Sequence, residues 1–208
     1  MPGRREPRRP EPPTAAGLQL PVRSAWRRSP IGSERLALVP IQPEDAADLF
    51  AAIEASRWHL ERWLPWVPFT VSLEATLRYA EACVVDWDTG RALRFCLRER
   101  ASSRLVGVVS LDTLVHLHRS CELGYWLSHD VTGKGLMREA AATLLGQAFG
   151  PLGLHRVRCA AATDNHASLR VISHLGFTFE GISRQAEWVA SRWLDHAVFA
   201  RLSTDVAP

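Results

Sequence analysis

The segment 121–149 constrains the fold most, because it predicts a strand, a glycine-containing turn and a helix in direct succession. In residues 121–127, alternation places Glu122 and Trp126 on one face of the strand and the apolar residues between them on the other. After Gly135, apolar residues recur at about four-residue spacing, which predicts an amphipathic helix. Gly150 and the proline that follows it end this helix.

The turn between this strand and helix has the features of an anion site. Gly133 and Gly135 allow backbone conformations closed to other residues and let a ligand approach the main chain. The first amides of a helix lack intrahelical partners and carry partial positive charge, and Lys134 adds to it. The alternative is a turn that only caps the helix. A dinucleotide fingerprint would need glycine at Arg138, and a P-loop would need Ser or Thr at Gly135, so neither motif fits.

Further short motifs accompany this segment in a fixed order. They are Glu122-x-Gly-Tyr-Trp-Leu127, Thr132-Gly-Lys-Gly-Leu-Met137, Gly153-Leu-His-Arg-Val157, Asn165-x-x-Ser168, Leu175-Gly-Phe177 and Glu180-Gly181. The set resembles the GNAT superfamily of acyl-CoA-dependent N-acetyltransferases, most closely its branch of ribosomal-protein serine/alanine N-terminal acetyltransferases. The resemblance covers roughly residues 35–202. It implies an α/β (α+β) fold, a three-layer α/β/α sandwich around a mixed, mostly antiparallel sheet.

Length and composition fit one soluble globular domain. The 208 residues are 47% hydrophobic and 23% charged, which is ordinary for a globular protein. No apolar run approaches the roughly 20 residues of a membrane-spanning helix, and no signal peptide is evident, so a cytoplasmic location is expected. The four cysteines are widely spaced without a Cys-x-x-Cys pair, which favours buried thiols over a zinc site or disulfides.

The positive charge of the chain is concentrated at its N-terminus. Residues 1–30 hold seven arginines against two glutamates, a balance of +5, so the rest of the chain sums to −2. They also hold seven of the 13 prolines. We therefore expect an Arg/Pro-rich, disordered or loosely attached extension over 1–33 and one domain over 34–204. The extension would contact RNA or the ribosome through its charge, or be dispensable, or reflect a misassigned translation start.

Outside the central segment, the residue patterns predict further elements. They are a strand at 36–41, helices at 44–55 and 73–86, a hairpin of 92–98 with 105–111, a strand at 154–162, a helix from Asp164 or Asn165 to Gly176, and a hairpin of 188–189 with 193–202. His116 and His118 could share one face of a strand end as metal ligands, but no third ligand at a sensible spacing accompanies them, which favours solvated histidines. No metal site is expected.

The resemblance implies how acetyl-CoA would bind. In the family, the pantetheine arm pairs with the backbone of the central strand and the pyrophosphate lies on the turn. By position, the strand contacts fall to Trp126 and Leu127. The turn contacts fall to main-chain groups of Thr132, Gly133, Lys134, Gly135, Leu136 and Met137. Thr132 replaces the usual Gln or Arg of the family, and Met137 occurs in the closest branch.

Two side chains are candidates for catalysis. Acyl transfer to an amine needs a neutral nucleophile and a stabilised leaving thiolate. Glu122 would act as the base, through water, and its alternative role is a surface salt bridge. By resemblance, Ser168 would protonate the thiolate and Asn165 would anchor the coenzyme arm. Their alternatives are a solvated helix serine and a helix cap.

The acceptor is the least constrained part. Trp58, Trp63 and Trp66 lie on a proline-interrupted segment and would wall an acceptor pocket, or pack in the core. The resemblance implies N-acetylation of a ribosomal protein's N-terminal α-amine, by a monomer or homodimer. One alternative acceptor is a small amine such as an antibiotic or polyamine. A second alternative is transfer of a larger acyl group such as succinyl, for which Arg57 or Arg62 would supply a basic pocket. A third is a non-catalytic acyl-CoA-binding regulatory module.

Overall fold

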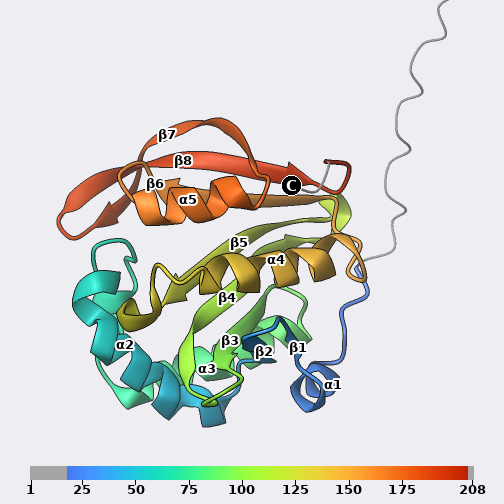
Figure 1. Cartoon of the computed structure of the whole chain (residues 1–208), viewed down its shortest axis with the longest axis vertical. Helices are drawn as coiled ribbons and strands as arrows, with labels where there is room; N and C mark the ends of the chain where they lie inside the picture. Colours follow the sequence, from blue (N-terminus) through green and yellow to red (C-terminus); the bar gives the residue numbers. More distant parts are fainter. Residues whose placement is uncertain (1–17, 206–208) are drawn as a thin grey trace, which may run out of the picture.

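The computed structural model describes residues 18–205, in which one β-sheet is covered by helices on both faces (Figure 1). The strands are β1 (Ile31–Gly32), β2 (Leu36–Pro40), β3 (Leu93–Glu99), β4 (Leu105–Val115), β5 (Ser120–Leu127), β6 (Arg156–Ala162), β7 (Thr178–Val189) and β8 (Arg192–Leu202). The helices are α1 (Arg23–Arg28), α2 (Ala46–Leu60), α3 (Leu73–Asp88), α4 (Leu136–Phe149) and α5 (His166–His174). Short 3-10 turns are η1 (Pro43–Asp45), η2 (Val67–Phe69), η3 (His116–His118) and η4 (His129–Val131).

The eight strands form a single sheet in the order β1-β2-β3-β4-β5-β6-β8-β7. Every neighbouring pair is antiparallel except β5 and β6, which are parallel because α4 connects them. The mixed, mostly antiparallel sheet expected from the sequence is therefore confirmed. The parallel pair lies in the middle of the sheet, and the candidate site is built there.

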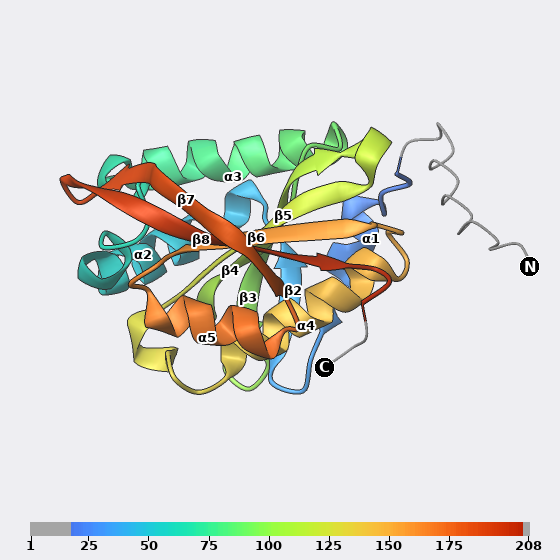
Figure 2. The ribbon, with the colours of Figure 1, turned by 90° about the horizontal axis from the view of Figure 1, so that it is seen from above.

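Helices α4 and α5 cover one face of the sheet, and α2 and α3 cover the other (Figure 2). The larger core cluster joins Val109, Leu144 and Val157 on the α4 face, and a second cluster joins Ile41, Leu49 and Trp126 on the α2 face. The three-layer sandwich is thus confirmed. The alternation predicted for β5 is confirmed as well, since Leu123 and Trp126 belong to opposite clusters.

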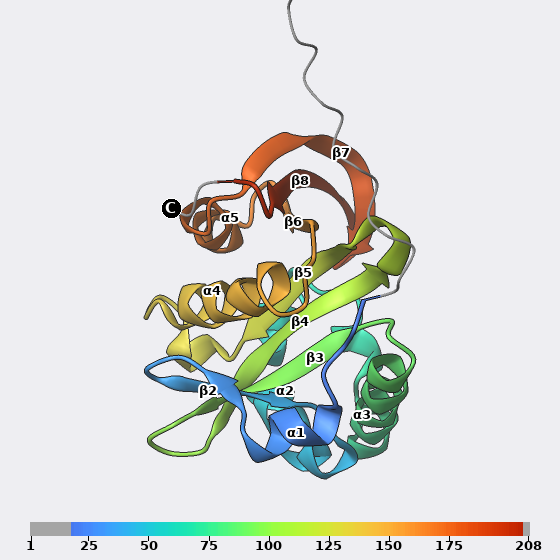
Figure 3. The ribbon, with the colours of Figure 1, turned by 90° about the vertical axis from the view of Figure 1, so that its right-hand side faces the viewer.

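Residues 18–33 pack against the domain, so this part of the extension expected over 1–33 is not loosely attached. The α1 helix lies beside β2 (Figure 3). The Trp26 ring packs 5.8 Å from that of Trp87 and 5.7 Å from that of Phe95, and Arg27 forms an ion pair with Asp45. A few large apolar residues suffice to anchor a segment when the domain offers a partner surface. Four of the seven arginines expected to contact RNA or the ribosome lie outside the described residues: Arg4, Arg5, Arg8 and Arg9.

The other predicted elements were correct in type, with shifts at their ends. The C-terminal hairpin is confirmed, since Trp188 pairs with Trp193 across its turn. However, β7 begins at Thr178, ten residues before the predicted strand. Most β7 side chains are exposed, so this edge strand lacks the apolar alternation from which a strand is predicted. All four cysteines are buried and free, as expected.

Candidate functional site

The edge of β5 that faces β6 is open over most of its length. The two strands pair only from Ser120 to Glu122 on β5, opposite Arg156 to Arg158 on β6. From Leu123 onward β5 pairs with β4 alone, while β6 continues in register with β8. Backbone groups on that side of residues 123–127 therefore have no strand partner within the described chain. An extended ligand with amide groups can take the vacant position in the ladder.

The glycine turn ends beside this open edge. Gly133 and Gly135 have φ values of +75° and +76°, the left-handed conformation predicted for them. None of the main-chain amides of residues 133–138 donates a hydrogen bond to another described residue. The space in front of Gly133 is open, with no atom within 4 Å of the position a Cβ would take. The turn thus presents amides at the positive end of α4, where a phosphate would bind.

Arg35 lies next to this turn, and sequence reasoning did not identify it. Its Nη1 donates to the Lys134 carbonyl oxygen at 3.0 Å, and its Nη2 lies 2.6 Å from Glu139 Oε2. Burial disfavours the charged form of Glu139, but hydrogen bonds from Ser33 and Arg35 outweigh this and lower its pKa. Arg35 therefore neutralises the one acidic residue in the first turn of α4. No local pattern links residues 104 positions apart, so the sequence held no signal for this pair.

Glu122 lies where β5 and β6 diverge, on the α2/α3 face. Its Oε1 accepts a hydrogen bond from Arg158 Nη1 at 2.5 Å, so the alternative role as a salt-bridge partner is realised. Asp112 is the β4 residue directly opposite Glu122. That carboxylate accepts from Arg94 Nε at 2.7 Å and also from Ser110. Both carboxylates on this part of the face are thus engaged by arginines.

Gly124 leaves room on the same face of β5 for two side chains of β4. A Cβ built on Gly124 would lie 2.8 Å from Ser110 Oγ and 3.0 Å from Asp112 Oδ2. The first distance is shorter than real Cβ atoms show. Ser110 and Asp112 therefore occupy the space beside Gly124, and a side chain at this position would displace them.

Asn165 and Ser168 lie at the start of α5, on the opposite face. The Asn165 side chain accepts a hydrogen bond from the Ser168 amide at 3.2 Å and so caps the helix. Ser168 Oγ lies 2.8 Å from the hydroxyl oxygen of Tyr125. Tyr125 is a second residue that the sequence analysis did not single out. It was visible only as one of the alternating apolar positions of the strand.

The three tryptophans proposed for the acceptor site contact different parts of the molecule. Trp58 is 58% exposed and packs against His129 in η4, with 4.5 Å between ring centroids. Trp63 packs against Val189 and neighbouring apolar residues at the β7–β8 turn, and Trp66 lies 6.3 Å from Trp126. The structure therefore does not join them into one wall. Of the aromatic pairs that the three tryptophans form within residues 18–205, the one between Trp66 and Trp126 involves a residue of β5.

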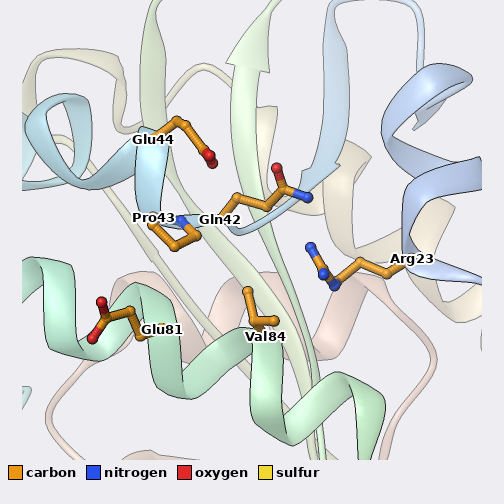
Figure 4. A pocket seen from close by; sticks show the side chains of 6 residues that line it. All are labelled: Arg23, Gln42, Pro43, Glu44, Glu81 and Val84. Carbon is orange, nitrogen blue, oxygen red and sulfur yellow. The ribbon is translucent and has the colours of Figure 1, made fainter.

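A cavity of about 290 Å³ lies elsewhere, between α1, η1 and α3 (Figure 4). It is lined by Arg23, Gln42, Pro43, Glu44, Glu81 and Val84, none of which belongs to β5, α4 or α5. Within residues 18–205 no group of three or more His, Cys, Asp or Glu side chains is placed to hold a metal ion. None of the helices described is both long and apolar enough to cross a membrane.

Comparison with known proteins identifies relatives of this chain. The family model of the acetyltransferase (GNAT) domain matches residues 35–178. The ribosomal-protein-serine acetyltransferase of Escherichia coli (strain K12) is 28% identical over 170 residues, which cover 82% of this chain and 94% of that protein. The solved structure of Mycobacterium smegmatis RimJ in complex with CoA-disulfide is 27% identical, with a TM-score of 0.75 over 80% of this chain and 81% of that chain.

A more distant structure shares the fold alone. The microcin C7 self-immunity acetyltransferase MccE, in complex with acetyl-CoA and AMP, is 23% identical with a TM-score of 0.78. The match covers 85% of this chain and 98% of that chain. The fold alone therefore does not identify the acceptor.

Proposed function

We propose that the acceptor of this protein is the N-terminal α-amine of a ribosomal protein in the cytoplasm. The chain belongs to the GNAT acetyltransferase family and is an acyl-CoA-dependent N-acetyltransferase. The E. coli relative is described as acting on a ribosomal protein serine. The observation that carries the proposal is the placement of Glu122 beside the open edge of β5.

Acetyl-CoA would lie with its pantetheine arm along residues 123–127 and its pyrophosphate on the turn 132–137. The length of unpaired β5 supports the first contact, and the main-chain amides of residues 133–137, which donate to no other described residue, support the second. Trp126 and Leu127 would contribute main-chain groups, because the Trp126 side chain is buried in the α2-side core. Leu136 and Met137 would likewise act through their amides, since their side chains are buried. Asn165, as the cap of α5, would hold the helix beside the arm.

The charges around Glu122 favour an acceptor that is already partly neutral. An α-amine of pKa ~7.8 is roughly a third neutral near pH 7.5, whereas a lysine of pKa ~10.4 is about a thousandth neutral. Glu122 and Asp112 are both held by arginines, so neither is a free carboxylate set aside for a strongly basic amine. Glu122 would remove one proton from the α-ammonium through water, and alignment on β5 would supply much of the rate.

The test is acetyl transfer measured with three matched acceptors. A peptide with a free N-terminal serine or alanine should be acetylated. The same peptide with a blocked N-terminus and one internal lysine should be inert, and so should spermidine. Turnover of spermidine with an inert peptide would establish the small-amine alternative. Binding of acetyl-CoA without turnover of any of the three would overturn this choice of acceptor and would point to the non-catalytic coenzyme-binding module.

A further inference from the structure

Two hydroxyl groups meet across the open side of β5. Tyr125 lies on β5 beyond its last pairing with β6, and its hydroxyl oxygen is 2.8 Å from Ser168 Oγ on α5. We propose that Tyr125 is a positioning residue: its hydroxyl donates to Ser168 Oγ and so directs the Ser168 proton toward the sulfur of the coenzyme. This inference rests on the proposed function and on the role that the family resemblance implies for Ser168, as the group that acts on the leaving thiolate.

The direction of the hydrogen bond decides what Ser168 can do. Each hydroxyl has one proton and can accept as well as donate. If Ser168 donated to Tyr125, no proton would remain for sulfur. Two other acceptors lie near the Tyr125 hydroxyl: the Ser168 carbonyl oxygen at 3.4 Å, which is long for an O–H···O bond, and the Cys159 sulfur, which is a weak acceptor. Ser168 Oγ at 2.8 Å is therefore the better acceptor for the tyrosine proton.

The surroundings of Tyr125 keep its hydroxyl protonated. Its ring packs against the core cluster on the α4 side of the sheet. Burial, and secondarily the nearby Cys159, raise the pKa of Tyr125 far above its ordinary value. Cys159 itself remains a thiol, because burial raises its pKa to about 12. Tyr125 is therefore a permanent donor rather than a group that titrates during catalysis.

Ser168 is held in place from its backbone. Its amide donates to the Asn165 side chain at 3.2 Å, which fixes the first turn of α5. Rotation about the Cα–Cβ and Cβ–Oγ bonds remains for the hydroxyl, and the hydrogen bond from Tyr125 restricts both rotations. Two hydrogen bonds in series also polarise one another, so donation from Ser168 strengthens as its acceptor becomes negative.

The atoms balance without a proton leaving Tyr125. The amine nitrogen attacks the thioester carbonyl carbon, the C–S bond breaks, and the electron pair passes to sulfur. Ser168 donates a hydrogen bond to the forming thiolate. The proton lost by the amine passes through water toward Glu122, and the thiolate takes its proton from solvent after the bond has broken. Tyr125 acts only by orienting Ser168.

The first experiment is a double-mutant cycle on acetyl transfer. Tyr125→Phe keeps the ring and removes the hydroxyl, so kcat should fall on the order of fivefold with KM for acetyl-CoA almost unchanged. Ser168→Ala should lower kcat more, and adding Tyr125→Phe to it should cause no further loss. Ser173→Ala removes an exposed hydroxyl on the same helix and is the control. The proposal would be overturned if the losses in kcat of the two single mutants multiplied in the double mutant. It would also be overturned if Tyr125→Phe alone caused no loss in kcat.

A second measurement needs no acceptor. The thiol of bound coenzyme A can be titrated by ultraviolet difference spectra against the same variant without ligand. Donation from Ser168 should lower the pKa of the bound thiol below the ~8.5 of an ordinary thiol. Tyr125→Phe should raise the pKa of the bound thiol again. The same substitution should leave this pKa unchanged in a protein that already carries Ser168→Ala. An unchanged thiol titration in Tyr125→Phe would contradict the inference, whereas failure of the parent protein to bind coenzyme A would contradict the proposed function.

Discussion

Glu122 and Arg158 form the last register pair between β5 and β6, and their side chains are joined by an ion pair at the point where the strands separate. The side chains are 46% and 40% exposed, so the pair contributes at most about 1 kcal/mol to stability. Its consequence is positional. The ion pair holds Glu122 Oε1 at the point where β5 and β6 separate. It leaves Glu122 Oε2 free of hydrogen bonds from the described residues.

Glu122→Gln should lose most of its acetyl-transfer rate at low pH and recover as pH rises. At low pH the acceptor amine is protonated and needs a base, whereas at high pH neutral amine is supplied without one. The loss should be on the order of 10- to 100-fold at pH 6, because alignment on β5 is retained. Pre-steady-state transfer to a peptide from pH 6 to 9 measures it. Arg158→Gln is the control, since it breaks the same ion pair but keeps the carboxylate. A profile parallel to the parent's would leave Glu122 without a role in proton transfer.

Gly135→Asp should weaken acetyl-CoA binding at least tenfold, about 1.4 kcal/mol, by placing a negative charge where the pyrophosphate would lie. Gly135→Asn is the matched control, because it has the same size, tolerates the left-handed φ of +76° and carries no charge. Calorimetry on both folded variants compares them. Equal affinities of the Asn and Asp variants would show that charge at this turn is irrelevant to coenzyme binding.

The Arg35–Glu139 pair should make stability depend on pH in acid. The pKa of Glu139 is lowered below 4.5 in the folded state. The stabilising contribution of Glu139 is therefore complete at pH values above its pKa in the unfolded state. It is lost as the pH falls through its pKa in the folded state. The free energy of unfolding, measured with denaturant, should fall between pH 6 and pH 3. This fall should be smaller, by up to roughly 1 kcal/mol, in Glu139→Gln than in the parent protein. An identical drop in both proteins would mean that the pair contributes nothing to folding.

Trp26→Ala should destabilise the domain by roughly 2–4 kcal/mol, because the indole packs on Trp87 and Phe95. Arg28→Ala, an exposed position of the same short helix, should change the free energy of unfolding by less than about 0.5 kcal/mol. Chemical denaturation measures both. Equal stability of the two variants would return residues 18–33 to the loosely attached segment expected from composition.

The sequence was most informative where local rules apply. The left-handed glycines at 133 and 135, the cap at Asn165 and the strand–turn–helix order depend on near neighbours, and all were predicted. Long-range relationships were not predicted. The contact of Arg35 with Glu139 and that of Tyr125 with Ser168 join residues 104 and 43 positions apart. The divergence of β5 from β6 after three residue pairs is likewise a property of the assembled sheet.

The most direct test of where acetyl-CoA binds is amide hydrogen exchange at residue resolution, with and without the coenzyme. Bound acetyl-CoA should slow exchange in residues 123–127 and 133–138, because the pantetheine arm and the pyrophosphate would occupy these main-chain groups. Exchange in α1 and at the β7–β8 turn should not change. Saturable binding of acetyl-CoA that leaves both segments unprotected would contradict the account.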